Sequence, residues 1–468
     1  MPRPPELRFT SAALLVSIVL LSACAVNRPP EAATTAARDQ VPETPEAWTG
    51  AGADPSDVEV GWIDSFEDPR LTTLVREAQS FNKNLQAAAA SVDRARALAN
   101  QAAAALKPSV NLSSGASRAG IASSGNQTSE LSLGVDVSWE ADLWGRLRAN
   151  RRGAVASAEA AEADFRYSQH SLAASVARGY FLAIEATRQE AVIQNTIEIL
   201  ERTLEIVNLK YENGAVSAQD VALARSDLAS ASEQLATIEG STRDALRALE
   251  VLLGRYPAAE VDVGAELPEP PPDPPAGLPS EILERRPDLV AAERRVAAAF
   301  DAVDQARAAR LPSVGLTGSI GGSSSALSSL LDPANVAWRI GTNLLAPIFD
   351  GGQRRQQVEI ATADQEQALA LYGQAALDAF REVESALDAG GVLERRETEL
   401  ETAAEQAREA YRIADLRYRE GESDLLDTLN IQRRVLAAES NLVTVRRLLL
   451  AQRVDLHLAL GGSWEPVD

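Results

Sequence analysis

Residues 105–112 read ALKPSVNL, and residues 309–316 read ARLPSVGL. The prolines of the two stretches are offset by 204 residues (312 − 108), and Tyr211 and Tyr418 open similar motifs at an offset of 207 (418 − 211). A near-constant offset over most of the length indicates a duplicated structural unit, which has to be recognised before other patterns are interpreted. We therefore expect one body built from two equivalent halves.

The composition excludes several classes of protein. A formal net charge of −22 opposes binding to nucleic acid, which needs a basic face. The chain has two histidines, His170 and His457, and one cysteine, so neither a zinc site nor a Cys/His dyad is expected. We interpret both histidines as surface or helix-packing residues, and we expect no enzyme, no metal site and no nucleic-acid partner.

The N-terminus predicts export. Residues 1–23 form a signal peptide, with two arginines followed by an apolar run at residues 14–21 that is too short to span a bilayer. The motif LSAC at residues 21–24 resembles a bacterial lipobox, which makes Cys24 the expected lipidation site; the alternative is an ordinary signal peptide with an incidental thiol. In the lipoproteins that this motif resembles, an aspartate after the cysteine typically retains the protein at the inner membrane. Ala25 stands there in this chain, so the resemblance favours the outer membrane. No later stretch approaches the ~18 apolar residues of a membrane helix, so a mature chain that crosses a membrane does so as a barrel.

Two regions alternate with a period of two. Apolar residues occupy every second position at 131–139 and again at 338–348, which predicts strands with one apolar face. A shorter strand follows each duplicated proline, giving hairpins at about 108–141 and 312–349. The hairpins are either a half-buried soluble sheet or lipid-facing strands; the second interpretation is favoured because little else in the chain could form a second apolar layer. Four strands cannot close a barrel, so three chains would pool about twelve.

The remaining segments have helical periodicity. Residues 146–213 contain no proline, and apolar residues recur there at the spacing of a coiled coil, as they do at 400–418. A solvated helical hairpin with one packed stripe is the alternative interpretation. The pair Gly390-Gly391 predicts a break in the second long helix.

The expected organisation therefore has six parts. They are the signal peptide at 1–23, a lipidated tether at 24–57, a first repeat at 58–256, a proline-rich connector at 257–281, a second repeat at 282–464 and a tail at 465–468.

Five motifs carry a resemblance that covers nearly all of the expected mature chain. They are Trp62, Phe66, Asp68-Pro69 and Leu71; Trp139-Glu140 with Asp142-Leu143-Trp144-Gly145; Arg285-Arg286-Pro287-Asp288 with Ala291-Ala292-Glu293; Pro347-Ile348-Phe349-Asp350-Gly351-Gly352; and Ala459-Leu460-Gly461-Gly462-Ser463-Trp464. In these motifs the chain resembles the outer membrane efflux proteins, the TolC-like family, and within it the lipoprotein ducts of RND-type tripartite pumps.

The resemblance implies a fold that is mainly α with a β-barrel portion: an internally duplicated TolC-like fold with long coiled-coil helices and four strands per chain. It implies a homotrimer with a twelve-stranded outer-membrane barrel and a helical tunnel through the periplasm. The implied partners are a periplasmic membrane-fusion adaptor and an inner-membrane transporter, and the implied cargo is small molecules such as drugs. No cofactor is expected apart from the covalent lipid on Cys24.

The turns that reverse the two long helical hairpins are the expected periplasmic tip. The candidate gate residues are Asp220, Asp427, Tyr211 and Tyr418, with turn glycines Gly214 and Gly421. By the resemblance, the two aspartates supply six carboxylates in a trimer, a ring that favours cations; alternatively each only stabilises a helix N-terminus. The tyrosines are candidates for hydrogen bonds between hairpins. Glu422 and Ser423 stand where the family often has a basic residue, so the partners that lock the closed tip are not identified.

Three other functions compete with drug efflux. Within the same architecture, the duct would serve metal-ion efflux or type I protein secretion, because the inner-membrane pump mostly selects the cargo. From a different class, the chain would be a periplasmic coiled-coil scaffold lipoprotein, although such a protein has no need of strands with an apolar face.

Overall fold

The computed structural model describes residues 31–50, 56, 61–120 and 127–463 of the 468-residue chain. Cys24 and the expected signal peptide lie outside these residues. Among the described helices, none combines enough length and apolarity to cross a bilayer.

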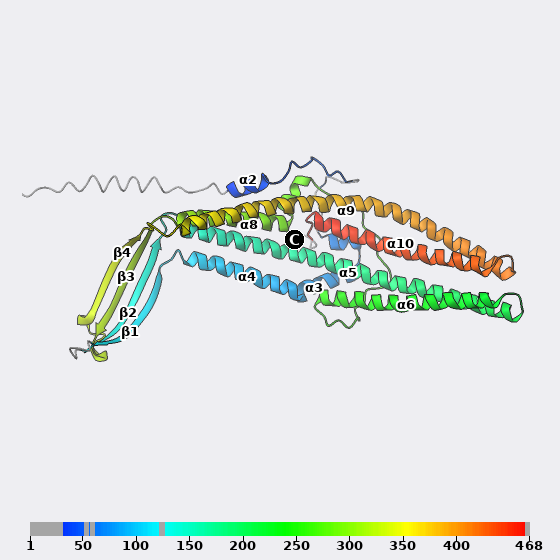
Figure 1. The fold of residues 1–468 in the computed structure, drawn as a ribbon, viewed down its shortest axis with the longest axis horizontal. Coiled ribbons are helices and arrows are strands. Elements are labelled where there is room, and N and C mark those ends of the chain that lie inside the picture. The colour runs from blue at the N-terminus through cyan, green and yellow to red at the C-terminus, as the bar shows by residue number, and fades with distance from the viewer. Residues whose placement is uncertain (1–30, 51–55, 57–60, 121–126, 464–468) are drawn as a thin grey trace, which may run out of the picture. The chain divides into compact units, whose positions relative to one another are not determined.

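From α4 in the first repeat and α8 in the second, the two repeats have the same order of elements (Figure 1). The first contains α3 (Pro69–Phe81), α4 (Lys83–Ala104), β1 (Ser109–Gly120), β2 (Gln127–Ala141), α5 (Arg146–Glu212) and α6 (Ala218–Leu253). The second contains α8 (Pro287–Ala308), β3 (Ser313–Ser324), β4 (Val336–Leu345), α9 (Gln353–Glu420) and α10 (Leu425–Ala459). Shorter helices are α2 (Ala32–Arg38), α7 (Ile282–Arg285) and the single turns η1 (Trp62–Phe66), η2 (Pro279–Glu281), η3 (Leu327–Ser329) and η4 (Pro333–Asn335). The duplication predicted from the sequence is confirmed.

Local chemistry sets the ends of the helices. Asp68 caps α3 by accepting hydrogen bonds from the backbone N–H of Arg70 at 2.9 Å and of Leu71 at 3.3 Å. Pro287 opens α8, where its missing N–H costs nothing. Pro108 and Pro312 stand between the end of a helix and the start of a strand, because proline removes the N–H that a helix interior needs.

The chain divides into two compact units that cut across the repeats. The sheet unit contains Ser91–Glu162 and Ala291–Gln374 with the N-terminal segment to Pro42, and the hairpin unit contains Glu43–Ala90, Ala163–Val290 and Ala375–Asp468. Each unit therefore takes a part from both repeats. The predicted boundaries of the two repeats, 58–256 and 282–464, therefore do not coincide with the boundaries of the compact units.

In the sheet unit, the four strands form one antiparallel sheet in the order β1-β2-β3-β4 (Figure 1). β1 and β4 are its edges, and they run in opposite directions because every neighbouring pair is antiparallel. Helices α5 and α8 of this unit are joined by an ion pair between Arg152 and Asp301, with 2.7 Å between nitrogen and oxygen.

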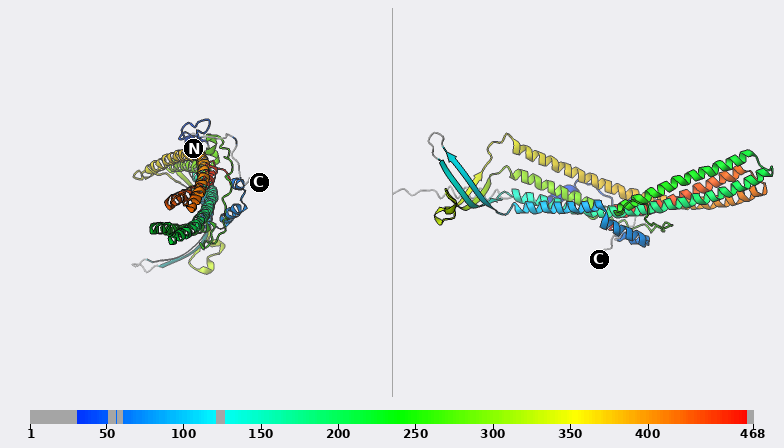
Figure 2. Two further views of the ribbon diagram at one scale, coloured as in Figure 1. Left: turned by 90° about the vertical axis from the view of Figure 1, so that its right-hand side faces the viewer. Right: turned by 90° about the horizontal axis from the view of Figure 1, so that it is seen from below.

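In the hairpin unit, α5 pairs with α6 and α9 with α10, and the two hairpins lie side by side (Figure 2). An apolar cluster joins all four helices and includes Val207 of α5, Val221 of α6, Tyr418 of α9 and Leu429 of α10. A larger core forms around η1 and α3, where Phe66, Tyr180 and Phe181 are fully buried. The helical hairpins expected from the coiled-coil spacing are therefore present.

The proline-rich connector is held by buried charge. The guanidinium of Arg453, which is 2% exposed, donates to the carbonyl of Pro271 at 2.9 Å and pairs with Asp273 and Glu394. The carboxylate of Glu250 accepts backbone N–H groups from Ala259 and Glu260, both at 2.7 Å. Because each buried charge has partners, these bonds offset the cost of desolvating the charges and fix the connector against the helices.

The predicted break at Gly390-Gly391 is wrong. α9 runs without interruption from Gln353 to Glu420. A Cβ at Gly390 would lie 3.0 Å from Nε2 of Gln452 and 3.3 Å from Nη1 of Arg453. The glycine therefore allows α10 to approach α9 closely, rather than ending the helix.

Candidate functional site

The register of the sheet separates an apolar face from a polar face. Cross-strand neighbours share a face, and one row joins Leu112, Val135, Ile320 and Trp338 across the four strands. The next row joins Asn111, Asp136, Ser319 and Arg339. Leu112 and Trp338 are 75% and 74% exposed, so nothing in a single described chain covers the apolar face. A sheet with this exposed apolar face matches the lipid-facing interpretation better than a half-buried soluble sheet.

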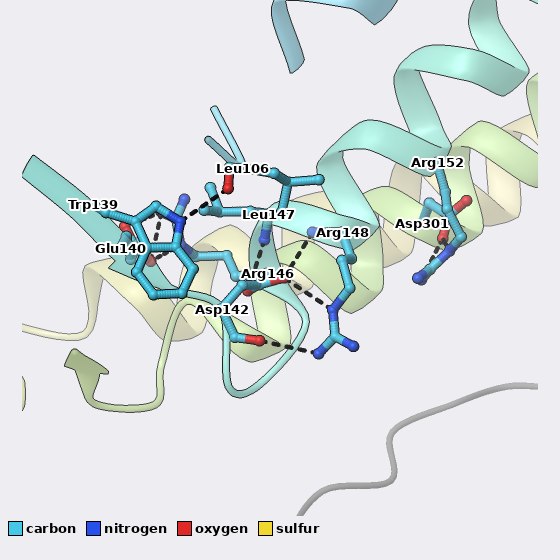
Figure 3. A network of polar contacts seen from close by, with 9 residues as sticks. All are labelled: Leu106, Trp139, Glu140, Asp142, Arg146, Leu147, Arg148, Arg152 and Asp301. Atoms are coloured by element: carbon cyan, nitrogen blue, oxygen red, sulfur yellow. Dashed lines mark hydrogen bonds and ion pairs between the residues drawn. The ribbon is translucent and has the colours of Figure 1, made fainter. Parts of the chain in front are cut away.

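The junction between β2 and α5 is braced by side chains (Figure 3). Glu140, on the polar face of β2, accepts two hydrogen bonds from Nη2 of Arg146, at 2.9 Å and 2.8 Å. Asp142 accepts the backbone N–H groups of Leu147 at 3.0 Å and Arg148 at 2.9 Å, which caps the first turn of α5. These bonds fix the direction in which the helix leaves the strand.

The motif tryptophans hold the same junction. The indole N–H of Trp139 donates to the carbonyl of Leu106 at 2.9 Å, and that of Trp144 donates to the carbonyl of Pro312 at 2.6 Å. Each bond ties the end of β2, or the loop after it, to the link between a helix and the strand that follows it. A cleft of about 270 Å³ lies beside them, lined by Trp144, Arg146 and Arg354 among others.

At the tip of the first hairpin, Gly214 has a φ of +71°, which favours glycine. Asp220 lies in the first turn of α6, where its carboxylate accepts the backbone N–H and the hydroxyl of Ser217, both at 2.8 Å. The hydroxyl of Ser217 in turn accepts the N–H of Asp220 at 3.3 Å. This reciprocal pair is a capping box, so the helix-stabilising role that the sequence left open for Asp220 is present in the structure.

The tip of the second hairpin is built differently. Gly421 has a φ of +81°, and Asp424 caps α10 by accepting the N–H of Asp427 at 2.9 Å. The carboxylate of Asp427 is exposed, and it makes no hydrogen bond or ion pair within the described part of the chain. The two aspartates are therefore equivalent in sequence but not in their bonding.

The two tip tyrosines also differ. Tyr418 is 3% exposed, whereas Tyr211 is 48% exposed. The hydroxyl of Tyr418 is buried and has no hydrogen-bond partner within the described chain. Burial, with a smaller contribution from the charge of Asp220, raises the pKa of Tyr418. The expected hydroxyl hydrogen bond between hairpins is thus not made within one chain.

The structure supplies a contact that the sequence reasoning missed. Nζ of Lys210, in the last turn of α5, lies 4.1 Å from the ring centroid of Tyr418 and also donates to the backbone carbonyl of that residue. A cation over an aromatic face is stabilised by the ring quadrupole. Lys210 directly precedes Tyr211, so the only local signal was a basic residue beside a tip tyrosine.

The sequence also made predictions about Cys24, a metal site and the histidines. Cys24 lies outside the described residues, so its lipidation stays a prediction. Within the described ranges, no group of three or more His, Cys, Asp or Glu side chains is arranged to hold a metal ion. His457 is buried and stacks on Trp62, which is a packing role.

Comparison with known proteins defines the class of the chain. A model of the family described as outer membrane efflux protein matches residues 74–255 and 278–462, which are most of the sequence. The chain belongs to the outer membrane efflux protein family.

Individual relatives agree over nearly the full length. The pyoverdine export outer membrane protein OpmQ of Pseudomonas aeruginosa is 33% identical over 470 residues, covering 97% of this chain and 96% of the relative. The probable outer membrane lipoprotein SilC of Salmonella typhimurium is 29% identical, covering 87% of this chain and 88% of the relative. The solved structure of the outer-membrane channel OprN matches with a TM-score of 0.83 and 31% identity, covering 91% of this chain and 99% of that one.

The family fixes the fold class, the location and the general activity. The TolC-like fold predicted from the motifs is confirmed. The chain is an efflux protein of the outer membrane, and like the other members of its family it is a channel rather than an enzyme.

Proposed function

We propose that three copies of this chain form the exit channel of a tripartite efflux system, gated at the periplasmic tip of the helical hairpins. The assembly, the gate, the lipid anchor and the cargo are all parts of this proposal.

The observation that carries the proposal is the four-stranded sheet with one exposed apolar face and two unpaired edges. In a bilayer, each unpaired backbone N–H or C=O costs several kcal/mol, so a membrane sheet has to close on itself. β4 of one copy and β1 of the next run in opposite directions and can continue the antiparallel order. Three copies would then give 4 × 3, or about twelve, strands with the apolar face toward lipid and the polar face toward the passage.

The gate would lie at the hairpin tips. In a trimer, Asp220 and Asp427 would contribute 2 × 3 carboxylates around one axis. A ring of carboxylates attracts cations and repels anions. The exposed carboxylate of Asp427 is available for this role. The carboxylate of Asp220 would act in the ring while it also accepts the backbone N–H of Ser217 in the capping box.

The remaining parts are the anchor and the partners. Lipid on Cys24 would hold the N-terminus in the outer membrane, and no resident cofactor is part of the proposal. The tips would meet a periplasmic membrane-fusion adaptor bound to an inner-membrane transporter, most simply of the RND type. The cargo would be drugs and other small toxic molecules, with metal ions or secreted proteins as the alternatives.

The test is intracellular accumulation of a fluorescent dye and several antibiotics in a strain that lacks the gene. Accumulation should rise several-fold and return to normal with the intact gene. Complementation with Ile320→Lys, on the apolar face, should fail, while Ser319→Lys, its neighbour on the polar face, should succeed. If drug accumulation stays normal but the strain becomes sensitive to a metal ion, the cargo is metal ions. If drug accumulation stays normal but the strain no longer releases a secreted protein, the cargo is that protein.

A further inference from the structure

The duplication gives each helical hairpin the same pair of residues at its tip. Lys210 and Tyr211 end the first long helix of the hairpin unit, and Arg417 and Tyr418 stand at the equivalent positions of the second, at an offset of 207 (417 − 210; 418 − 211). Each tip therefore has one basic side chain followed by one tyrosine.

Within the described chain, one cation–aromatic contact forms among these four residues, between Lys210 and Tyr418. Lys210 of α5 covers the ring of Tyr418 of α9 at 4.1 Å, and Tyr418 is almost fully buried. The two helices run side by side in the same direction here: both end at a hairpin tip, and Thr203, seven residues before Lys210, lies beside Tyr411, seven residues before Tyr418. The contact thus belongs to a regular packing of α5 against α9.

The other two members of the pairs are left open. The ring of Tyr211 is 48% exposed. The side chain of Arg417 is 58% exposed, and its ion pair with Glu422 spans 3.9 Å between nitrogen and oxygen. An exposed pair of that length contributes little, so it does not hold the guanidinium in place.

We infer that Arg417 of one copy covers the ring of Tyr211 of the next copy in the assembled channel. The inference rests on the trimer proposed above. In a ring where first and second hairpins alternate, α9 meets α5 of its own chain on one side and α5 of the next copy on the other. In the contact between copies, the duplication then gives Arg417 the position that Lys210 has within a chain. It gives Tyr211 of the next copy the position of Tyr418.

The chemistry of the open residues fits this contact. Arginine is the cation found more often over aromatic rings, because its planar guanidinium stacks and is weakly hydrated. Ile413, one turn before Arg417 on α9, is 45% exposed, and Leu416, its neighbour in the sequence, is 48% exposed, so apolar surface near the cation is also left uncovered. The trimer would then contain 2 × 3 alternating cation–aromatic contacts, which close the ring of hairpins at the tip.

Cross-linking tests the inference in the full-length chain. A variant with Arg417→Cys and Tyr211→Cys is treated with a short bis-maleimide, because both side chains are long and their backbones need not come within disulfide reach. Covalent dimers and trimers should form on denaturing gels. The control with Lys210→Cys and Tyr418→Cys should link within the chain and stay monomeric, and the chain whose only cysteine is Cys24 should give no product.

A native gel run in parallel separates the two hypotheses. If the wild-type chain is not trimeric, the proposed function fails. If the Arg417→Cys/Tyr211→Cys variant is trimeric but yields no link between chains, the inference is overturned and the trimer stands.

A second measurement does not depend on cysteine. Arg417→Gln and Tyr211→Leu should each lower the temperature at which the trimer dissociates, and the double variant should lower it no further than the larger single effect. Additive effects would show that the two residues do not touch and would overturn the inference.

Discussion

The imidazole of His457 stacks on the indole of Trp62, with ring centroids 5.6 Å apart and the planes inclined by 15°. The contact joins the last turns of α10 to η1 at the start of the first repeat. His457 is 3% exposed, its Nδ1 has no hydrogen-bond partner in the described chain, and Arg453 lies one turn away. Burial, with a smaller contribution from Arg453, lowers the pKa of His457 from 6.5 to about 4.

This histidine predicts a loss of stability in mild acid. Between pH 6.5 and about 4 the unfolded chain binds a proton at this residue and the folded chain does not, so the free energy of unfolding falls as the pH decreases through that window. At 1.36 kcal/mol per pH unit, the full effect is about 3 kcal/mol per chain. Thermal unfolding should show this slope in the wild type, and His457→Phe, which keeps an aromatic stack, should remove it. An unchanged slope in the variant would assign the acid sensitivity to carboxylates.

The two faces of the sheet predict opposite responses to the same charge. Ile320 and Ser319 are adjacent on the central strand β3 but lie in the apolar and polar rows respectively. A lysine facing lipid costs about 2–4 kcal/mol near the bilayer midplane, so Ile320→Lys should reduce the amount of folded protein in the outer-membrane fraction. Ser319→Lys, facing the polar side between Asp136 and Arg339, should leave that amount close to the wild-type value. Equal losses in both variants would contradict the lipid-facing assignment.

Periodic patterns predicted what repeats locally in this chain. Strands β2 and β4 and their apolar face follow from alternation at residues 131–139 and 338–348, because a period of two can place side chains on only two faces. The strands after the two prolines, β1 and β3, were expected to be the shorter ones, but β3 has 12 residues and is longer than β4, which has 10. The proline-free stretch at 146–213 predicted α5 almost to its ends. These features depend on residues that are close together in the sequence, so the pattern of a single sequence is enough to predict them.

Contacts between distant segments were not predictable in the same way. Lys210 reaches Tyr418 only because α5 and α9 pack together, and no local pattern near either residue encodes that distance. The same limit produced the error at Gly390, where the local signal of a helix breaker was outweighed by close packing against Gln452. The differing roles of Asp220 and Asp427 also depend on their neighbours Ser217 and Asp424.

The adjacent glycines of α9 offer a direct test of that packing. A Cβ at Gly391 would meet only Nη1 of Arg395 at 3.7 Å, so Gly391→Ala should raise the free energy of unfolding by about 1 kcal/mol through helix propensity. Gly390→Val should lower the stability by at least as much, because the larger side chain displaces Gln452 and Arg453. Thermal unfolding of the two variants checks both signs. Stabilisation by Gly390→Val would mean that α10 does not approach this glycine.

The carboxylates at the tip predict ion selectivity, and the structure supplies a control for the capping role. In planar bilayers, the double variant Asp220→Asn with Asp427→Asn should lose most of the preference for cations, because six negative charges leave the proposed ring. Ser217→Ala removes the hydroxyl side of the capping box and should cost about 1 kcal/mol of stability, yet it leaves the charge in place and should keep the selectivity. Asp427→Asn alone should have the larger effect of the two single changes, since its carboxylate is exposed and unpaired within the described chain, whereas that of Asp220 is bonded to Ser217. If the double variant conducts with the same selectivity and closed-state leak as the wild type, the aspartates act only at their helix termini and the gate lies elsewhere.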